Sequence, residues 1–180
     1  MEKDSSDSKG IKKIVVIGPE STGKSTLSST LAKHYATTWV QEHARTYIDE
    51  LNRSYKEHDL IEIAKEQLQL EDNAIKKTNK LLICDTNLIT IQIWSEYKYG
   101  RCAPEIIDSI NSRKYDLYLI TNVDIPWADD PQREHPHLRE FFFDLYKNTI
   151  KKTGVPYIEI SGEDFNDRLI TAINAIDKII

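Results

Sequence analysis

The feature that most constrains this chain is an apolar run followed directly by a glycine-rich loop and an amphipathic stretch. Residues 14–17 read Ile-Val-Val-Ile, and residues 18–25 read Gly-Pro-Glu-Ser-Thr-Gly-Lys-Ser. Leu27, Leu31 and Tyr35 then recur at helical spacing. This is the strand, loop and helix context of the G-x-x-x-x-G-K-[ST] phosphate loop, whose backbone N–H groups surround phosphate oxygens at a helix N-terminus. The motif predicts that the chain binds a nucleoside triphosphate.

The side chains of this loop have separate expected roles. Lys24 is expected to reach the β- and γ-phosphate oxygens, and the Ser25 hydroxyl is expected to ligate Mg²⁺. ATP and Mg²⁺ are therefore the predicted cofactors. The alternative is an ordinary glycine-rich turn with an incidental lysine, which the surrounding strand and helix patterns disfavour. The predicted phosphate site consists of Gly18, Glu20, Ser21, Thr22, Gly23, Lys24, Ser25 and Thr26.

Short apolar runs alternate with amphipathic stretches along the chain, a pattern typical of a parallel sheet covered by helices. The predicted strands are residues 11–17, 38–41, 81–85, 115–121 and 156–160. Apolar helix faces are predicted within 57–79 and at two later positions, marked by Leu138, Phe142, Leu145 and Tyr146 and by Phe165, Leu169, Ile173 and Ile176. We predict an α/β fold of the P-loop NTPase class, with three α/β/α layers, a parallel five-stranded sheet and a lid loop.

Length and charge limit the classes of protein that need to be considered. With 180 residues, the chain is expected to form a single domain over residues 11–180, after a polar and disordered tail at 1–10. A net charge of −5 with interspersed signs gives no reason to expect a nucleic acid or an anionic membrane as partner. The two cysteines, Cys84 and Cys102, lack paired spacing, and no apolar run is long enough to span a bilayer. A cytoplasmic protein is expected.

The third predicted strand ends in a carboxylate. Leu81, Leu82, Ile83 and Cys84 are apolar, and Asp85 follows them. Because ligands of open α/β sheets bind at the carboxyl ends of the strands, Asp85 is expected to complete the Mg²⁺ shell opposite the phosphate loop. The alternative is an N-cap for a helix that begins near residue 86, and the two roles are compatible.

The second predicted strand also leads into charged residues. Glu42 is expected to face the phosphate loop and to accept a proton from an attacking hydroxyl. Arg45 lies one helical turn later, where it is expected to neutralise a phosphate or to fix the Glu42 carboxylate. The alternative is an exposed ion pair at the start of a helix.

Residues 122–139 are rich in Asp, Pro, His and Arg and have little apolar periodicity. A polar loop of this length in a compact domain is usually a lid or a binding loop. We predict that Arg133 and Arg139 close over the transferring phosphoryl group and stabilise its charge, the alternative being ordinary solvated charge.

Aromatic and acidic residues suggest a pocket for a second substrate. In the lid, Trp127 lies among Asp124, Asp129 and Asp130; carboxylates accept hydrogen bonds from ribose hydroxyls, and an indole face stacks on a flat, electron-poor ring. Trp94 and Tyr97 lie one turn apart after Asp85 and are also candidates. For Trp94, packing in the core is an equal alternative. The predicted substrate-binding residues are Glu42, Arg45, Trp94, Tyr97, Asp124, Trp127 and Asp129.

Several blocks of the sequence together resemble one family. GPESTGKST, EHARTYI, ICDTNLITIQIWSEYKYG, YDLYLITNVDIPWADDPQREHP and VPYIEISG are similar to the ribosylnicotinamide kinase domain of NadR-type proteins, over about residues 14–162. The resemblance implies a kinase that transfers the ATP γ-phosphate to the 5′-hydroxyl of nicotinamide riboside, giving the mononucleotide. It also implies that the turn at Gly162 borders the adenine. In such an enzyme the catalytic residues would be Lys24, Glu42, Asp85, Arg133 and Arg139.

Two other functions remain open at this level. One is a P-loop kinase for another nucleoside or small metabolite. The other is an ATP-dependent regulatory switch without a small acceptor. A GTPase is disfavoured, because the lysine position of N-K-x-D is Asn122 and the glycine position of D-x-x-G is Leu88. The preference for ATP over GTP and the formation of a homo-oligomer are also open.

Overall fold

A computed structural model describes residues 10–180, so the predicted disordered tail lies outside the described residues except for Gly10. Five parallel strands form one sheet in the order β2-β3-β1-β4-β5. This confirms the predicted parallel five-stranded sheet, with the strand before the phosphate loop at its centre. The strands are β1 Lys12–Ile17, β2 Trp39–Val40, β3 Leu81–Asp85, β4 Leu117–Thr121 and β5 Tyr157–Ile160.

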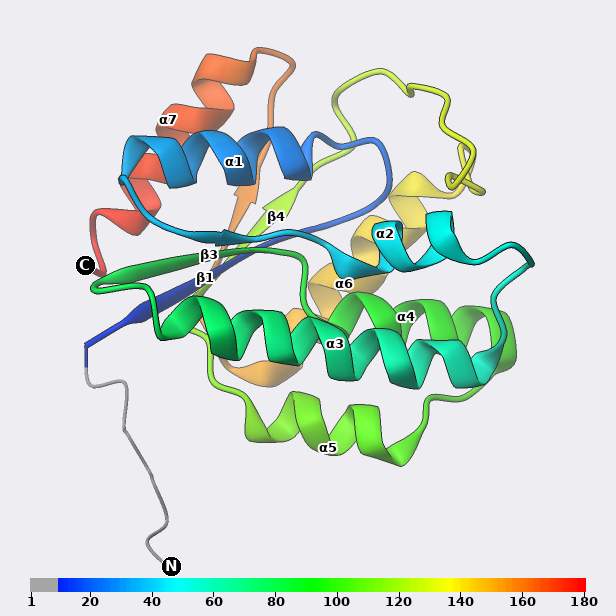
Figure 1. Cartoon of the computed structure of the whole chain (residues 1–180). Coiled ribbons are helices and arrows are strands. Elements are labelled where there is room, and N and C mark those ends of the chain that lie inside the picture. The colour runs from blue at the N-terminus through cyan, green and yellow to red at the C-terminus, as the bar shows by residue number, and fades with distance from the viewer. Residues whose placement is uncertain (1–9) are drawn as a thin grey trace, which may run out of the picture.

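Helices cover both faces of the sheet, as Figure 1 shows, which confirms the three-layer α/β/α fold. Helices α1 Lys24–His34 and α7 Phe165–Ile176 lie on one face, and α3 Glu57–Ile75, α4 Leu88–Tyr99 and α6 Arg139–Thr153 lie on the other. Helix α5 Pro104–Ser112 packs outside α3 and α4, and α2 His43–Glu50 follows β2. Within residues 10–180, no helix combines the length and apolarity needed to cross a bilayer.

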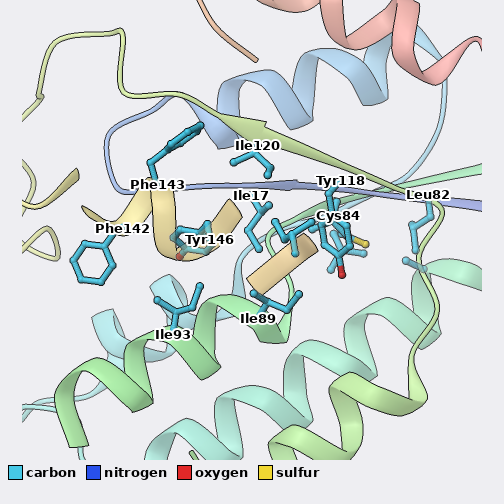
Figure 2. Packing of buried hydrophobic residues seen from close by; sticks show 14 residues of the cluster. Ile17, Leu82, Cys84, Ile89, Ile93, Tyr118, Ile120, Phe142, Phe143 and Tyr146 are labelled. Carbon is cyan, nitrogen blue, oxygen red and sulfur yellow. The ribbon is translucent and has the colours of Figure 1, made fainter. Parts of the chain in front are cut away.

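The side chains of the central strand β1 point alternately to the two faces of the sheet and so belong to two separate core clusters. Ile14 and Val16 pack with α1 and α7, whereas Val15 and Ile17 pack with α4 and α6. Figure 2 shows the second cluster, in which Ile17 lies near side chains from α4 and α6. Because successive side chains of a strand point to opposite faces, a strand covered on both faces must be apolar throughout. The run from residue 14 to 17 meets this requirement.

Some predicted boundaries are too long. The strand predicted at 38–41 is observed only at Trp39–Val40, and the helix predicted at 57–79 ends at Ile75. Residues 76–80 read Lys-Lys-Thr-Asn-Lys and carry no apolar side chain for the sheet face, so the helix gives way to a turn. The strand predicted at 115–121 begins at Leu117.

A carboxylate is buried beneath the sheet, away from the phosphate loop. Glu71 of α3 is 0 % exposed, and the Tyr115 hydroxyl lies 2.9 and 3.2 Å from its two oxygens. Arg113 approaches only to 4.0 Å and forms its closer ion pair with Asp72 at 2.6 Å. Burial raises the pKa of Glu71 to about 7, and the hydroxyl and the guanidinium offset part of this rise.

The raised pKa of Glu71 predicts a pH-dependent stability. Between the ordinary value of 4.5 and about 7, the folded chain binds this proton more tightly than the unfolded chain does. The free energy of unfolding should therefore fall as pH rises through this window, by on the order of 2–3 kcal/mol. Urea unfolding of the wild type and of Glu71→Gln at pH 5.5 and pH 8 measures the difference.

In Glu71→Gln the part of this loss that Glu71 contributes should disappear, because the amide does not ionise, while the part from Glu42, whose pKa burial also raises to about 7, should remain. Glu62→Gln changes an exposed glutamate of the same helix and should retain the wild-type pH dependence. Parallel pH profiles for the wild type and Glu71→Gln would contradict the assignment of the titration to Glu71.

Candidate active site

The phosphate loop lies directly against the end of β4. Gly18 has a φ of +148°, and a Cβ at this position would lie 2.6 Å from the Thr121 hydroxyl oxygen. The hydroxyl oxygens of Thr22 and Thr121 are 2.7 Å apart, and Thr22 also donates to the Pro19 carbonyl at 2.8 Å. Only glycine fits the first position, and the loop is held by buried hydrogen bonds.

The loop ends where α1 begins. Gly23 has a φ of +77° and occupies the N-cap position, and no side chain caps the helix. The first N–H groups of α1 therefore receive no side-chain acceptor at the helix end, which is the arrangement that binds anions. The Lys24 ammonium donates to the Pro19 carbonyl at 2.7 Å. Burial lowers the pKa of Lys24, and Glu42 and Asp85 oppose this shift.

A cavity of about 160 Å³ opens over this loop. All the predicted phosphate-site residues of the loop line this cavity. Four other predicted site residues, Glu42, Arg45, Trp94 and Arg133, also line it, whereas Gly162 does not. The lining residues are Gly18, Glu20, Ser21, Thr22, Gly23, Lys24, Ser25, Thr26, Glu42, Arg45, Thr90, Trp94, Gln132, Arg133 and Tyr146.

Glu42 stands at the start of α2 and faces this cavity. It holds the N-cap position, but its side chain makes no capping hydrogen bond. Burial raises the pKa of Glu42 to about 7, while Lys24 lowers it and Asp85 raises it. A carboxylate that titrates near neutral pH is suited to accept a proton from a hydroxyl group.

Asp85 ends β3 beside the phosphate loop. It is 2 % exposed, and its Oδ1 has no hydrogen-bond partner. Burial raises the pKa of Asp85, whereas a hydrogen bond from Ser25 and the charge of Lys24 lower it. A carboxylate and a hydroxyl oxygen are the ligand types that Mg²⁺ prefers, so the two residues fit this ion. The alternative N-cap role for Asp85 is wrong, because Asn87 caps α4 by accepting from the Ile89 N–H at 3.1 Å.

Arg45 joins α2 to the lid. Its guanidinium pairs with Asp130, and not with Glu42 as one of our expectations had it. The Gln132 side-chain amide donates to the Arg45 carbonyl at 3.1 Å and also to Asp49. The lid therefore crosses the cavity beside α2.

The lid is also attached to the phosphate loop itself. Glu20 accepts hydrogen bonds from the N–H groups of Glu134 at 3.2 Å and His135 at 3.3 Å. The Ser21 hydroxyl accepts from the Ala128 N–H at 2.9 Å, and Ser21 has a φ of +56°, which is unusual for a residue with a Cβ. Glu20 and Ser21 thus place their side chains toward the lid.

The two lid arginines lie in different surroundings. Arg133 lines the phosphate cavity, where it contacts the Ser21 hydroxyl at 3.4 Å and the Ala128 carbonyl. Arg139 donates to the carbonyls of Ile125 at 2.9 Å and Ser21 at 3.2 Å, and does not line this cavity. Of the two, Arg133 has the position from which a phosphate can be reached.

A second cavity of about 290 Å³ adjoins the first and shares Glu20, Trp94 and Gln132 with it. Tyr97, which is 44 % exposed, packs edge-on against His135 and Phe142 at 5.2 and 4.9 Å between ring centroids. The lining residues are Glu20, Ile48, Tyr55, Trp94, Tyr97, Lys98, Gln132, Glu134, His135 and Phe142.

Three predicted substrate-binding residues line none of the cavities described. The Asp124 carboxylate accepts from the Gly162 N–H at 2.6 Å, beyond β5. The Trp127 indole N–H donates to Asp129 at 2.9 Å, and the Arg139 guanidinium carbon lies 5.8 Å from the Trp127 ring.

Several cavity-lining residues had no predicted site role: Tyr55, Thr90, Gln132, His135, Phe142 and Tyr146. For Gln132 and His135 a signal existed, since both belong to the polar loop at 122–139. Phe142 and Tyr146 carried only a core signal, because they lie on the apolar face of α6.

Comparison with known proteins places the chain in a family. The family model described as an AAA domain matches residues 13–168. The trifunctional NAD biosynthesis/regulator protein NadR of Escherichia coli (strain K12) is 26% identical over 178 residues, which cover 94% of this chain and 43% of that protein. NadR of Salmonella typhimurium (strain LT2) has the same identity and coverage. The chain therefore spans less than half the length of these relatives.

Among solved structures, NadR in complex with NR has a TM-score of 0.77 at 21% identity and aligns with 93% of this chain and 49% of its own. Deoxyadenosine kinase from M. mycoides with bound dATP has a TM-score of 0.57 at 15% identity, covering 92% and 99%. At these identities the likeness shows the fold alone. The family model covers most of the chain and carries the assignment: the chain, which is similar to NadR proteins as its motifs indicated, belongs to the AAA domain family.

Proposed function

We propose that this protein is an ATP- and Mg²⁺-dependent kinase that phosphorylates the 5′-hydroxyl of nicotinamide riboside to give nicotinamide mononucleotide. The observation that carries the proposal is the pair of adjoining cavities, one over the phosphate loop and one lined by aromatic side chains. The similarity to NadR, a protein of NAD biosynthesis solved in complex with NR, supports nicotinamide riboside as the acceptor.

The first cavity suits the triphosphate donor. Its wall contains the uncapped N-terminus of α1 and the ammonium of Lys24. Both attract phosphate oxygens, and a bound phosphate would replace the Pro19 carbonyl as the partner of Lys24. Arg133 enters the same cavity from the lid and would bind the phosphoryl group as it transfers.

The second cavity suits a flat cationic acceptor. Trp94 lines both cavities, whereas Tyr55 and Tyr97 line only the second of the two. The Lys98 ammonium lies 3.7 Å from the centroid of the Tyr55 ring and so occupies that ring, which leaves Trp94 and Tyr97 as the rings for a cationic acceptor. Glu20 and Glu134 also line this cavity, and their two negative charges exceed the one positive charge of Lys98. The nicotinamide ring of the riboside is a pyridinium, which such a pocket would favour.

The proposed reaction is an in-line displacement at the γ-phosphorus. The 5′-oxygen of the riboside forms the new P–O bond while the bond to the β-phosphate oxygen breaks. The hydroxyl proton passes to the Glu42 carboxylate, and Lys24 and Arg133 offset the charge on the phosphoryl oxygens. Mg²⁺ held by Ser25 and Asp85 would neutralise phosphate charge when it is bound.

Substitution of Lys24 should lower kcat more than substitution of Glu42. The transition state of phosphoryl transfer is loose, so charge and position contribute more than the base does. Lys24→Ala is expected to lower kcat by on the order of 10³-fold and Glu42→Gln by about 100-fold. An ADP-release assay with ATP, Mg²⁺ and nicotinamide riboside measures both, with Lys33→Ala at the exposed end of α1 as control. Equal losses in the two variants would contradict this order.

The same assay tests the pH dependence of Glu42. The base acts when it is deprotonated, and the pKa of Glu42 is about 7. The value of kcat/KM for the riboside should therefore rise with pH through about 7 and level off above it. Glu42→Gln should flatten this rise. A wild-type profile that remains in the variant would assign the titration to another group.

Trp94 and Trp127 should differ in their effect on the acceptor. Trp94 lines both cavities, whereas Trp127 lines neither. Trp94→Ala is expected to raise the KM for the riboside roughly tenfold, because a ring–cation contact is lost. Trp127→Ala should change it less than about threefold. A larger rise in KM for Trp127→Ala than for Trp94→Ala would indicate that the acceptor binds at Trp127.

The product of the wild-type reaction tests the proposal as a whole. Riboside-dependent ADP release with nicotinamide mononucleotide as product is the expected outcome. If ADP release does not respond to the riboside but rises with another nucleoside, that nucleoside is the acceptor and nicotinamide riboside is not. Binding of ATP without any acceptor-dependent turnover would favour a regulatory switch.

A further inference from the structure

A buried amide of α3 holds the backbone on both sides of Glu42. The Gln67 side chain is 2 % exposed, and its Oε1 accepts from the His43 N–H at 2.8 Å. Its Nε2 donates to the Gln41 carbonyl at 3.4 Å. This carbonyl belongs to the peptide group that precedes Glu42, and the His43 N–H belongs to the one that follows it. One side chain therefore holds both peptide groups of the proposed base.

Secondary structure leaves this segment without other support. Strand β2 is at the edge of the sheet, pairs with β3 and ends at Val40. Helix α2 begins at His43, and the first N–H groups of an α-helix have no partner within the helix. Glu42 lies between the two with an extended backbone. A polar side chain from another element is needed to satisfy the backbone here, and Gln67 supplies it.

The place of Gln67 on α3 gives no reason for an amide from packing alone. Leu60, Ile63 and Ala64 are buried in one apolar cluster, and Gln67 follows Ile63 by one helical turn on the same face. Burial of an amide costs free energy unless its donor and its acceptor are both hydrogen-bonded. An apolar side chain would avoid this cost, so the amide is explained by its bonds to the neighbours of Glu42.

Other contacts already attach α2 to α3. Ala44 is buried in the same apolar cluster as Leu60 of α3. The Tyr47 hydroxyl donates to Asp59, a buried carboxylate of α3, at 3.2 Å. The two bonds of Gln67 therefore act on the segment that carries Glu42, and their loss should loosen this segment without detaching the helix.

We propose that Gln67 is a positioning residue for Glu42. By fixing the peptide groups on either side, it holds the carboxylate at the phosphate cavity, where the acceptor hydroxyl must lie. A base has to lie within about 3 Å of the proton that it takes, and a misplacement of about 1 Å can lower the rate by on the order of 100-fold. Gln67 lines neither cavity, so it acts through Glu42. The inference rests on the proposed function, in which Glu42 is the base.

Gln67→Met tests this role, because methionine is also long and unbranched but has no amide. In the ADP-release assay it should lower kcat by about tenfold, since the base is then less well placed. The Kd for Mg-ATP, measured by calorimetry, should change by less than about twofold. Gln69→Met is the same substitution at an exposed position of α3 and should leave both values unchanged. Melting temperatures confirm that each variant is folded.

A double-mutant cycle separates positioning of the base from general support of the site. Once Glu42→Gln has removed the base, Gln67→Met should lower kcat further by less than about twofold. A loss of about tenfold in both backgrounds would assign Gln67 to the general structure of the site and would overturn the inference. A Gln67→Met variant with the kcat of the wild type would overturn it as well.

Amide hydrogen exchange tests the same contact without turnover. The His43 N–H has Gln67 as its partner, so in the wild type it should exchange about tenfold more slowly than the Arg45 N–H of the same first turn. In Gln67→Met this difference should disappear. Equal exchange at the two positions in the wild type would overturn the inference even if the variant does not fold. A wild type without acceptor-dependent turnover would remove the proposed function, and the exchange rates would then decide whether Gln67 fixes the segment of Glu42.

Discussion

The contact between the phosphate loop and the end of β4 supports the rest of the site. Gly18 approaches Thr121 so closely that no Cβ fits, and the buried Thr22 and Thr121 hydroxyls fix the loop from the same side. Because β1 is the central strand, the loop lies at the middle of the sheet edge, with β3 on one side and β4 on the other. Glu42 and Asp85 are positioned relative to this loop by the ends of β2 and β3, and Arg133 is positioned by the lid.

The two sides of the loop serve different partners. Backbone groups and Lys24 face the phosphate cavity, while the side chains of Glu20 and Ser21 bind backbone N–H groups of the lid. Lid and phosphate loop are therefore mechanically joined, and a displacement of one changes hydrogen bonds of the other. The position of Arg133 at the cavity depends on this attachment, because Ser21 holds the lid segment through the Ala128 N–H and also contacts the Arg133 guanidinium.

Local patterns predicted the sheet, the phosphate loop and the strand-end carboxylates, because each depends on a short segment and on the rule that strand ends meet at one edge. The lid was different. Asp124 and Trp127 were expected at the acceptor, yet they lie at the β5 turn and beside Arg139. In a loop without periodic apolar residues, the sequence does not indicate toward which part of the molecule a side chain points. Tyr55 was missed for another reason: it precedes α3 and reaches Trp94 of α4 only through the packing of those helices.

Burial acts on the ionisable groups of the free site in one sense, against their charged forms. Glu42 and Asp85 are carboxylates whose pKa burial raises, and Lys24 is an amine whose pKa burial lowers. Each shift reduces the charge that must be buried without a counter-ion. A triphosphate that enters beside Lys24 would supply negative charge that favours the ammonium form of this lysine, and the same negative charge would raise the pKa of Glu42 further. In the proposed reaction, Ser25 and Asp85 would hold Mg²⁺, and this charge together with Arg133 would offset the phosphates and favour the carboxylate form of Glu42.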